Sequence, residues 1–389
     1  MSVLLMRGQL KFLRESGFDV AVVSAPGEDL TAIARTEGVR PIEVRMTREI
    51  APLRDIATLF HFCSMLYRVR PAVINFGTPK AGLIAGLAAR LTGVPCRLYT
   101  LRGIRAETTT GLKRRLLLLS ERMACACAHR VICVSESVRQ KAVSLGIVKQ
   151  ERTEVLGSGS SRGVDLEIFG ATVERIRAAA TWREEKGIPK DAVIIGFVGR
   201  FVKDKGIEDL FEAYLRLRKR FVELRLLLVG EFEEGDPVST AVREQIKRDP
   251  QVTITGFVRD TAPYYQVMDV LALPTRREGF PTVVLEAHAA EKAVVAYRAT
   301  GTVDAVVDGV NGILVPQGDV VALEESLERL ISNRELAQAM GRNGRARVEG
   351  EFQPMRIWSE LANTYVRLLG ERGIRCAGIQ CSGDRSRRG

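Results

Sequence analysis

Two glutamates, Glu278 and Glu286, lie eight positions apart in the stretch EGFPTVVLEA, on either side of a Gly-Phe-Pro bend. Glu286 falls within an apolar run, where burying an unpaired carboxylate is costly, so this residue requires either a partner or a function. If a helix begins at the bend, Glu286 lies on the same face as Thr282, four positions earlier. A carboxylate there can accept hydrogen bonds from the two hydroxyls of a ribose, while Glu278 in the preceding loop can reach a hydroxyl of another sugar.

The bend itself has the composition of an anion-binding helix start. Gly279 allows the chain to turn, and Pro281 suits the first position of a helix. The first amides of that helix, at residues 282–284, have no partner within the helix and point toward any bound anion. The pattern indicates a cradle for a nucleotide sugar. The alternative is structural, with the two glutamates paired to nearby cations: Arg276, Arg277 or Lys292.

Two cations follow a second predicted strand, in IGFVGRFVKDKGIEDLFEAY. A buried strand leads to a turn at Gly199, and Arg200 and Lys205 then occupy the loop before a helix that begins near Gly206. Fixed cations beside a helix N-terminus suit a diphosphate. The alternative is that both charges are solvated surface residues.

Strands and helices must position these residues, and the sequence shows an alternation of strand and helix patterns. Short runs rich in β-branched residues alternate with helical patterns such as 205–220 and 322–331. Several runs are apolar throughout, as parallel strands covered on both faces must be. The alternation predicts an α/β fold with parallel sheets. The predicted strands span residues 19–24, 72–76, 96–100, 130–135, 192–199, 224–230, 252–256, 270–274 and 293–297.

The alternation lapses once, around LGSGSSRGVDLEIFG (156–170), where Gly and Ser cluster and a linker is expected. Two doubly wound domains, 1–163 and 164–353, would then face each other across a cleft, each with the C-terminal ends of its strands toward it. Beyond residue 353 we expect a last helix over 354–370 and a disordered, polar, Gly-rich tail over 371–389.

The composition of the 389 residues narrows the class of partner. Apolar residues make up 46% and charged residues 27%, which is ordinary for a soluble globular protein. No apolar run reaches a membrane span of roughly 18 residues, and the first residues lack a signal-peptide pattern, so we predict a cytoplasmic protein. The net charge of +11 favours anionic partners, but no basic track with interleaved aromatics indicates nucleic acid. Seven cysteines without a Cys-x-x-Cys pair, and only three histidines, predict no metal site.

The motifs together resemble one family. EGFPTVVLEA matches the Glu-x7-Glu signature of retaining glycosyltransferase family 4, with the GT-B fold, and further segments follow in the expected order from Met1 to about Leu369. Four of them resemble the branch that builds capsular, O-antigen and related bacterial polysaccharides. The resemblance also implies that the helix over 354–370 returns to pack on the N-terminal domain. The further segments are FGTPKAGLIAGLAARLTGVPCRLYTLRG, ETTTGLKRRLLLLSERMACACAHRVICVSES, LGSGSSRGVD, GRFVKDKGI, TGFVRD and ATGTVDAVVDGVNGILVPQGD.

The resemblance implies a role for each candidate residue. Arg200 and Lys205 would bind the donor diphosphate. Glu278 would hold the transferred sugar, and Glu286 the ribose. Because there is no Asp-x-Asp motif, fixed cations and helix amides would stabilise the leaving diphosphate without a metal ion, and no cofactor is expected. The other donor-side residues, which would contact the phosphates or the base, are Gly199, Phe257, Val258, Gly279, Phe280, Pro281, Thr282 and Val283.

Two departures from the family pattern concern the acceptor side. Where members often carry a Val-His-Gly segment, this chain has Leu101-Arg102-Gly103. Arg102 cannot act as a base but suits an acceptor phosphate, and a front-face retaining transfer needs no protein base. We assign Arg102, with Thr78 and Lys80, to the acceptor side. The family also begins with a strand and a glycine-rich loop, whereas MSVLLMRGQLKFLRESG reads as the helix that follows them, so the acceptor half is expected to be incomplete.

The segment GLKRRLLLLSERMACACAHR (111–130) interleaves basic residues with leucines, as a helix resting on an anionic membrane would. A core helix with a solvated basic end explains the same letters. The resemblance predicts transfer from a nucleotide-sugar donor, most simply UDP-linked, to a glycan or polyprenyl-diphosphate-linked acceptor, by a cytoplasmic enzyme peripheral to the inner face of the plasma membrane. The alternatives are an inactive relic that binds nucleotide sugars or glycans, and a GT-B relative such as an epimerase or a phosphorylase.

Overall fold

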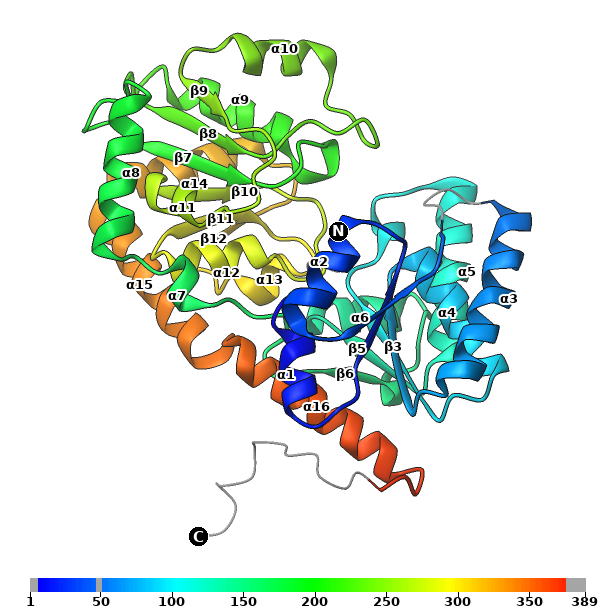
Figure 1. Ribbon diagram of the computed structural model, residues 1–389. Coiled ribbons are helices and arrows are strands. Elements are labelled where there is room, and N and C mark those ends of the chain that lie inside the picture. Colours follow the sequence, from blue (N-terminus) through cyan, green and yellow to red (C-terminus); the bar gives the residue numbers. More distant parts are fainter. Residues whose placement is uncertain (1–5, 47–50, 376–389) are drawn as a thin grey trace. The chain divides into compact units, whose positions relative to one another are not determined.

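The computed structural model describes residues 6–46 and 51–375, and it divides the chain into two compact units (Figure 1). One unit contains residues 1–162 together with 354–389, and the other contains residues 163–353. The first five residues lie outside the described part of the chain. So does the part of the predicted disordered tail (371–389) from residue 376 onward, with Cys376 and Cys381.

The first unit holds two separate parallel sheets. Four strands pair in the order β3-β4-β5-β6, and β1 pairs only with β2 in a second sheet. The strands are β1 Ala21–Ser24, β2 Arg40–Glu43, β3 Val73–Gly77, β4 Cys96–Leu101, β5 Arg130–Cys133 and β6 Thr153–Val155. The helices are α1 Gln9–Glu15, α2 Glu28–Glu37, α3 Pro52–Val69, α4 Pro79–Leu91, α5 Gly111–Cys127, α6 Glu136–Ser144 and, from the end of the chain, α16 Pro354–Gly370.

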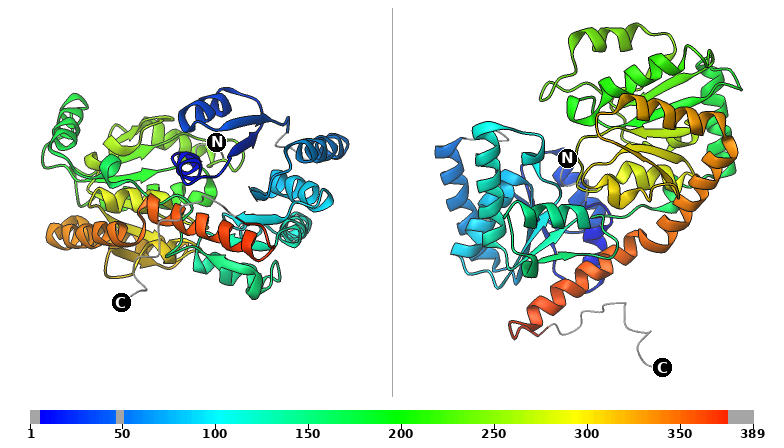
Figure 2. Two further views of the ribbon diagram at one scale, coloured as in Figure 1. Left: turned by 60° about the horizontal axis from the view of Figure 1, so that its bottom comes forward. Right: turned by 180° about the vertical axis from the view of Figure 1, so that it is seen from behind.

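Helix α16 is part of the first unit although unit two separates it in sequence from the rest (Figure 2). Its apolar face, including Leu361 and Leu368, joins one buried cluster with Leu98 of β4 and Ile132 of β5. The hydroxyl of Tyr365 on the same helix accepts a 2.8 Å hydrogen bond from Asn75. The described part of the first unit therefore takes its core from both ends of the chain.

The second unit is one six-stranded parallel sheet, in the order β12-β11-β10-β7-β8-β9. Strands β7 and β11 are buried along their whole length, as strands covered on both faces must be. The strand order reverses between β7 and β10, and such switch points are where open α/β sheets bind ligands. The strands are β7 Ile194–Val198, β8 Arg225–Val229, β9 Val252–Ile254, β10 Val270–Leu273, β11 Ala293–Tyr297 and β12 Gly312–Val315.

The helices of this unit precede its first strand, connect its strands and follow its last strand (Figure 1). They are α7 Leu166–Phe169, α8 Val173–Glu185, α9 Ile207–Leu217, α10 Thr240–Arg248, α11 Ala262–Val267, α12 Thr282–Ala289, α13 Thr302–Ala305, α14 Val320–Ser332 and α15 Arg334–Glu351. The parallel sheets of both units confirm the predicted α/β class. The predicted linker over 156–170 contains the short helix α7, and three strands, β2, β6 and β12, were not predicted.

Candidate active site

Most of the candidate donor residues follow β7 and β10, the two strands that flank the switch point of the second unit. Strand β7 ends at Val198, and the Gly199 amide then donates a 3.0 Å hydrogen bond to the Val229 carbonyl of β8. Arg200 follows at this sheet edge, and its Nη1 atom lies 2.8 Å from Glu233 in the loop after β8. Both side chains are more than one-third exposed, so water screens the pair and it is weak. A bound anion can therefore take the guanidinium from Glu233 at small cost.

Lys205 is the last residue of a 3-10 turn, Lys203–Lys205, that leads into α9. Gly206 follows with φ of 67°, and a Cβ there would collide with the Pro274 carbonyl just after β10. Only glycine therefore lets the loop after β7 approach the loop after β10 this closely. The approach brings the Lys205 ammonium into an ion pair with Glu278, and each side chain is 18% exposed.

The loop that carries Glu278 is held by the loop after β11. The Glu278 amide donates a 3.0 Å hydrogen bond to the Thr300 carbonyl. Gly301 has φ of 81°, and a Cβ on it would lie 2.6 Å from the Gly279 carbonyl oxygen. Thr300 and Gly301 therefore belong to the wall of this site. Both residues lie in the ATGTVD segment, whose glycine was the only sign of this role in the sequence.

The nearby arginines, which the structural alternative paired with the two glutamates, each have an aspartate as a partner. Arg276 lies 3.0 Å from Asp209, and Arg277 lies 2.9 Å from Asp204. Lys292 is half-buried, and desolvation lowers its pKa, while the charges of Asp269 and Glu291 act in the opposite direction. Glu278 thus has Lys205 as its cationic partner, a pairing that sequence analysis did not weigh.

Helix α12 begins at Thr282, one residue later than predicted, so Pro281 is its N-cap. The Val284 amide donates to the Pro281 carbonyl at 3.0 Å. The amides of Thr282 and Val283 have no acceptor within the described part of the chain, so two of the three predicted amides remain available to an anion. The preceding Phe280 packs its ring against Phe352.

Glu286 is 4% exposed and accepts a 2.7 Å hydrogen bond from the Tyr265 hydroxyl through Oε2. This hydrogen bond offsets part of the free-energy cost of burying the carboxylate within an apolar run. It also fixes the orientation of the carboxyl group on the second turn of α12. Sequence analysis did not identify Tyr265, since nothing in its local pattern distinguishes it from a core aromatic.

Phe257 and Val258 follow β9, at the same C-terminal ends of the strands as the other candidates. Phe257 is 65% exposed, which leaves its ring free for a flat base, and Val258 packs partly against the core.

His288, two positions beyond Glu286, has a different environment. Its ring lies 3.0 Å from the Asn311 carbonyl, and burial lowers its pKa to about 4. His288 is therefore a neutral core residue.

The acceptor-side candidates lie in the first unit, after β3 and β4. Thr78 occupies the N-cap position of α4 with φ of 82°, a strained value for a residue with a side chain. Lys80 lies 2.7 Å from Asp55 of α3. Arg102 follows β4, burial lowers its pKa, and its Nη1 atom is buried with no hydrogen-bond partner in the described part of the chain. A buried guanidinium nitrogen without an acceptor is costly, and an anion would satisfy it.

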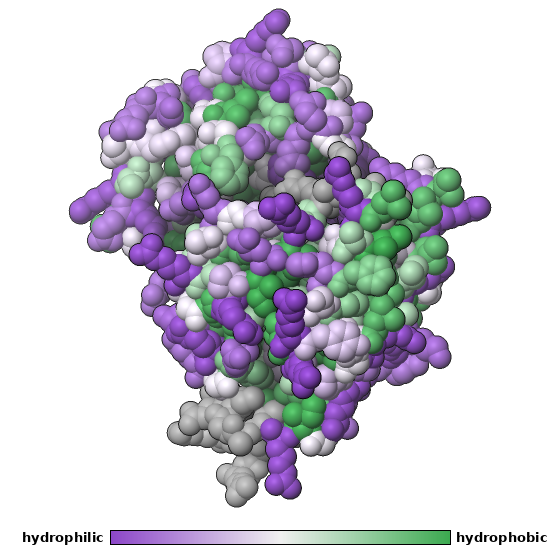
Figure 3. All heavy atoms as spheres, turned by 45° about the vertical axis from the view of Figure 1, so that its right-hand side comes forward, coloured by the Kyte–Doolittle hydropathy of each residue, from purple (hydrophilic) through white to green (hydrophobic). Residues whose placement is uncertain are grey.

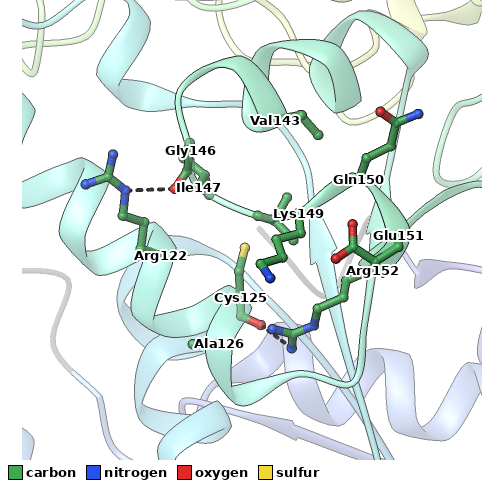
Figure 4. Close-up of a pocket in the computed structure, with 11 residues that line it drawn as sticks. Arg122, Cys125, Ala126, Val143, Gly146, Ile147, Lys149, Gln150, Glu151 and Arg152 are labelled. Carbon is green, nitrogen blue, oxygen red and sulfur yellow. Dashed lines mark hydrogen bonds between the residues drawn. The ribbon is translucent and has the colours of Figure 1, made fainter.

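A cavity of about 480 Å³ in the first unit lies away from these residues (Figure 4). It is lined where α5 and α6 end, and its arginines already bond to carbonyls: Arg122 to Gly146 at 3.0 Å and Arg152 to Cys125 at 3.1 Å. Helix C-termini carry partial negative charge, which disfavours an anionic ligand. None of the candidate site residues lines this cavity.

Comparison with known proteins shows the family to which the chain belongs. The family described as "Glycosyl transferase 4-like domain" matches residues 6–159, and "Glycosyl transferases group 1" matches residues 179–347. The chain belongs to the family 4 type of glycosyltransferases with the GT-B fold. It is 37% identical to the capsular polysaccharide biosynthesis glycosyltransferase CapM of Staphylococcus aureus, over 95% of each chain.

Two further similarities cover almost the whole chain. An Escherichia coli UDP-Gal:alpha-D-GlcNAc-diphosphoundecaprenol alpha-1,3-galactosyltransferase is 22% identical over 93% of this chain and 92% of its own. The crystal structure of Anabaena HepE in complex with UDP and glucose superposes with a TM-score of 0.77 at 21% identity, covering 93% of this chain and 95% of that one. The structural likeness shows the GT-B fold. No helix within the described residues is long and apolar enough to cross a membrane.

Proposed function

We propose that this glycosyltransferase moves a sugar from a UDP-linked donor to a polyprenyl-diphosphate-linked or glycan acceptor, with retention and without a metal ion, in the synthesis of a capsule or lipopolysaccharide. The observation that carries the proposal is the placement of Arg200, the Lys205–Glu278 ion pair and the α12 N-terminus in the segments that follow β7 and β10, the two strands that flank the switch point. The names of the relatives support the donor and acceptor: one acts in capsular polysaccharide synthesis, and another uses UDP-Gal and a diphosphoundecaprenol acceptor.

The charge of the leaving group sets the main task of the site. When the bond between the sugar anomeric carbon and the diphosphate oxygen breaks, negative charge develops on the β-phosphate of UDP. Arg200, Lys205 and the amides of Thr282 and Val283 are the fixed positive groups that would receive it. The acceptor hydroxyl attacks from the same face, and its proton passes to the departing phosphate oxygen. No side chain is then needed as a base, which agrees with Arg102 where relatives often carry histidine.

Binding of the donor would exchange one set of ion pairs for another. Arg200 would leave Glu233 and Lys205 would leave Glu278 as each turns to the diphosphate. Glu278 would then be available to a hydroxyl of the transferred sugar. Glu286, oriented by Tyr265, would accept from the ribose hydroxyls, and Phe257 would lie against the base.

On the acceptor side, the buried Nη1 atom of Arg102 would bind a phosphate of the lipid-linked acceptor. Such an acceptor resides in a membrane, whereas nucleotide sugars are dissolved substrates. We therefore place the enzyme in the cytoplasm, peripheral to the inner face of the plasma membrane.

The test is a transfer assay with the full chain, UDP-sugars and a diphosphate-linked lipid sugar, with EDTA present. The expected product has the donor's anomeric configuration, read by NMR coupling constants, at a rate that EDTA leaves unchanged. An inverted product, or a rate that requires Mg²⁺, would overturn the mechanism. Tight UDP binding without transfer to any acceptor would favour the inactive relic.

A further inference from the structure

Helices α3 and α5 of the first unit expose large apolar side chains that the proposed chemistry does not use. On α3, Leu53 is 85% exposed and Phe60 is 71% exposed, and on α5 Leu112 is 71% exposed. The complete sets are Leu53, Ile56, Phe60 and Tyr67 on α3, and Leu112, Leu116, Leu119 and Met123 on α5. Within each helix the spacing of three, four or seven residues places these side chains on one side.

These exposed sides are not the core-facing sides of the two helices. Helix α3 buries Phe62, Met65 and Leu66, and α5 buries Leu118 and Cys125. Each helix therefore has two apolar sides, of which the fold uses one. Helix α4 packs against both α3 and α5, so the two exposed stripes border the same layer of helices. Figure 3 shows hydrophobic side chains gathered on this side of the molecule, with hydrophilic ones around them.

The charges beside the stripes are almost all positive. Exposed cations accompany both: Arg54 and Arg68 on α3, and Lys113 and Arg115 on α5. Each helix contains one carboxylate, and neither faces solvent freely. Asp55 lies 2.7 Å from Lys80, and Glu121 is buried and accepts a 2.7 Å hydrogen bond from Tyr99.

We propose that α3 and α5 together form one docking surface for an anionic lipid bilayer, with the apolar stripes entering the headgroup boundary and the cations contacting lipid phosphates. The pairing of exposed apolar and cationic side chains, with no free carboxylate on either helix, matches that environment. A second copy of the chain fits less well, because two such surfaces would bring like charges together. The sequence indicated only the segment 111–130, and the structure adds α3. This membrane surface extends the proposed function. Only the link between the membrane and a lipid-linked substrate rests on that function.

The test is flotation of the full chain with vesicles of phosphatidylcholine alone and of phosphatidylcholine mixed with phosphatidylglycerol. Wild-type protein should float with the mixed vesicles, and added salt should weaken binding. The double variants Ile56→Glu with Phe60→Glu, and Leu116→Glu with Leu119→Glu, should each lower partitioning by tenfold or more. Arg115→Glu alone should lower it by about fivefold or more. The matched control is Ile176→Glu on α8, which is as exposed as Leu116 and should float like wild type.

Equal binding of wild type and both double variants would overturn the proposal, as would equal binding to vesicles with and without phosphatidylglycerol. Light scattering without lipid tests the alternative that a second copy of the chain binds this surface. A wild-type dimer that the α3 or α5 variants dissociate would show that the surface is a dimer interface and would overturn the membrane proposal. Calorimetric titration with UDP keeps this test separate from the proposed function. The variants should bind UDP like wild type, because the donor residues lie in the other unit.

Discussion

The ammonium group of Lys205 and the carboxylate of Glu278 form an ion pair that joins the loop after β7 to the loop after β10. The pair spans the point at which the strand order of the sheet reverses. The two side chains were assigned to different parts of one donor, the diphosphate and the transferred sugar. The two side chains satisfy each other in the structure, so a donor would have to compete with Glu278 for Lys205.

Removing either donor cation should weaken nucleotide binding. Arg200→Ala and Lys205→Ala should each reduce UDP affinity by about 1.5 to 3 kcal/mol, the range for hydrogen bonds to charged groups. Isothermal calorimetry in EDTA measures this, with Arg248→Ala on α10 as an exposed control cation. Glu233→Gln should instead raise UDP affinity, because it removes the carboxylate that competes for Arg200. Unchanged affinity in the two alanine variants would refute the diphosphate assignment.

The two glutamates should separate in their effects. Glu286→Gln should weaken UDP and UDP-sugar to a similar degree, because the ribose is common to both ligands. Glu278→Gln should preserve UDP affinity or increase it, since Lys205 is released, while turnover falls. Contacts that tighten as the glycosidic bond opens affect kcat rather than ground-state binding. Calorimetry beside a transfer assay decides it, and equal losses of UDP affinity would mean that the roles are misassigned.

The loop after β11 should control turnover through its glycine. Gly301→Ala places a Cβ 2.6 Å from the Gly279 carbonyl oxygen, so the Glu278 loop has to move. Gly309→Ala is the matched control, because Gly309 has a similar φ of 75° but open space around the added Cβ. Both variants should lose about 1 kcal/mol of stability from backbone strain. Only Gly301→Ala should also lose most of its transfer activity, and comparable activity in the two variants would remove Gly301 from the site.

His288 should make the free energy of unfolding depend on pH. Burial lowers its pKa to about 4, below the ordinary value of about 6.5. As the pH falls through this interval the unfolded chain binds the proton first, so stability is lost between about pH 6.5 and pH 4, up to about 3 kcal/mol. Urea unfolding at several pH values should show a shallower loss for His288→Gln than for wild type. Parallel curves would show that the buried ring does not remain neutral.

The strands that position the donor site were predictable because burial on both faces makes them apolar throughout, as in IIGFV and AVVAY. Strand β2, with the sequence RPIE, was missed because it is short, polar and largely exposed. The spacing of Glu278 and Glu286 is local, so the helix period placed them correctly on loop and helix. The contacts of Glu233, Tyr265 and Thr300 depend on which strands are neighbours in the sheet. Sequence pattern gives no strand order, so these three partners emerged only from the structure.

Helix α16 has a consequence for how the chain folds during synthesis. Residues 163–353 form a contiguous unit and can complete their core as soon as they leave the ribosome. The first unit cannot complete its core at that stage. Leu98 and Ile132 pack against Leu361 and Leu368, which are synthesised only after the second unit. The N-terminal segment of the first unit must therefore expose apolar surface to solvent while the second unit is synthesised and folds. During that interval it is the segment most open to chaperones, proteases and aggregation.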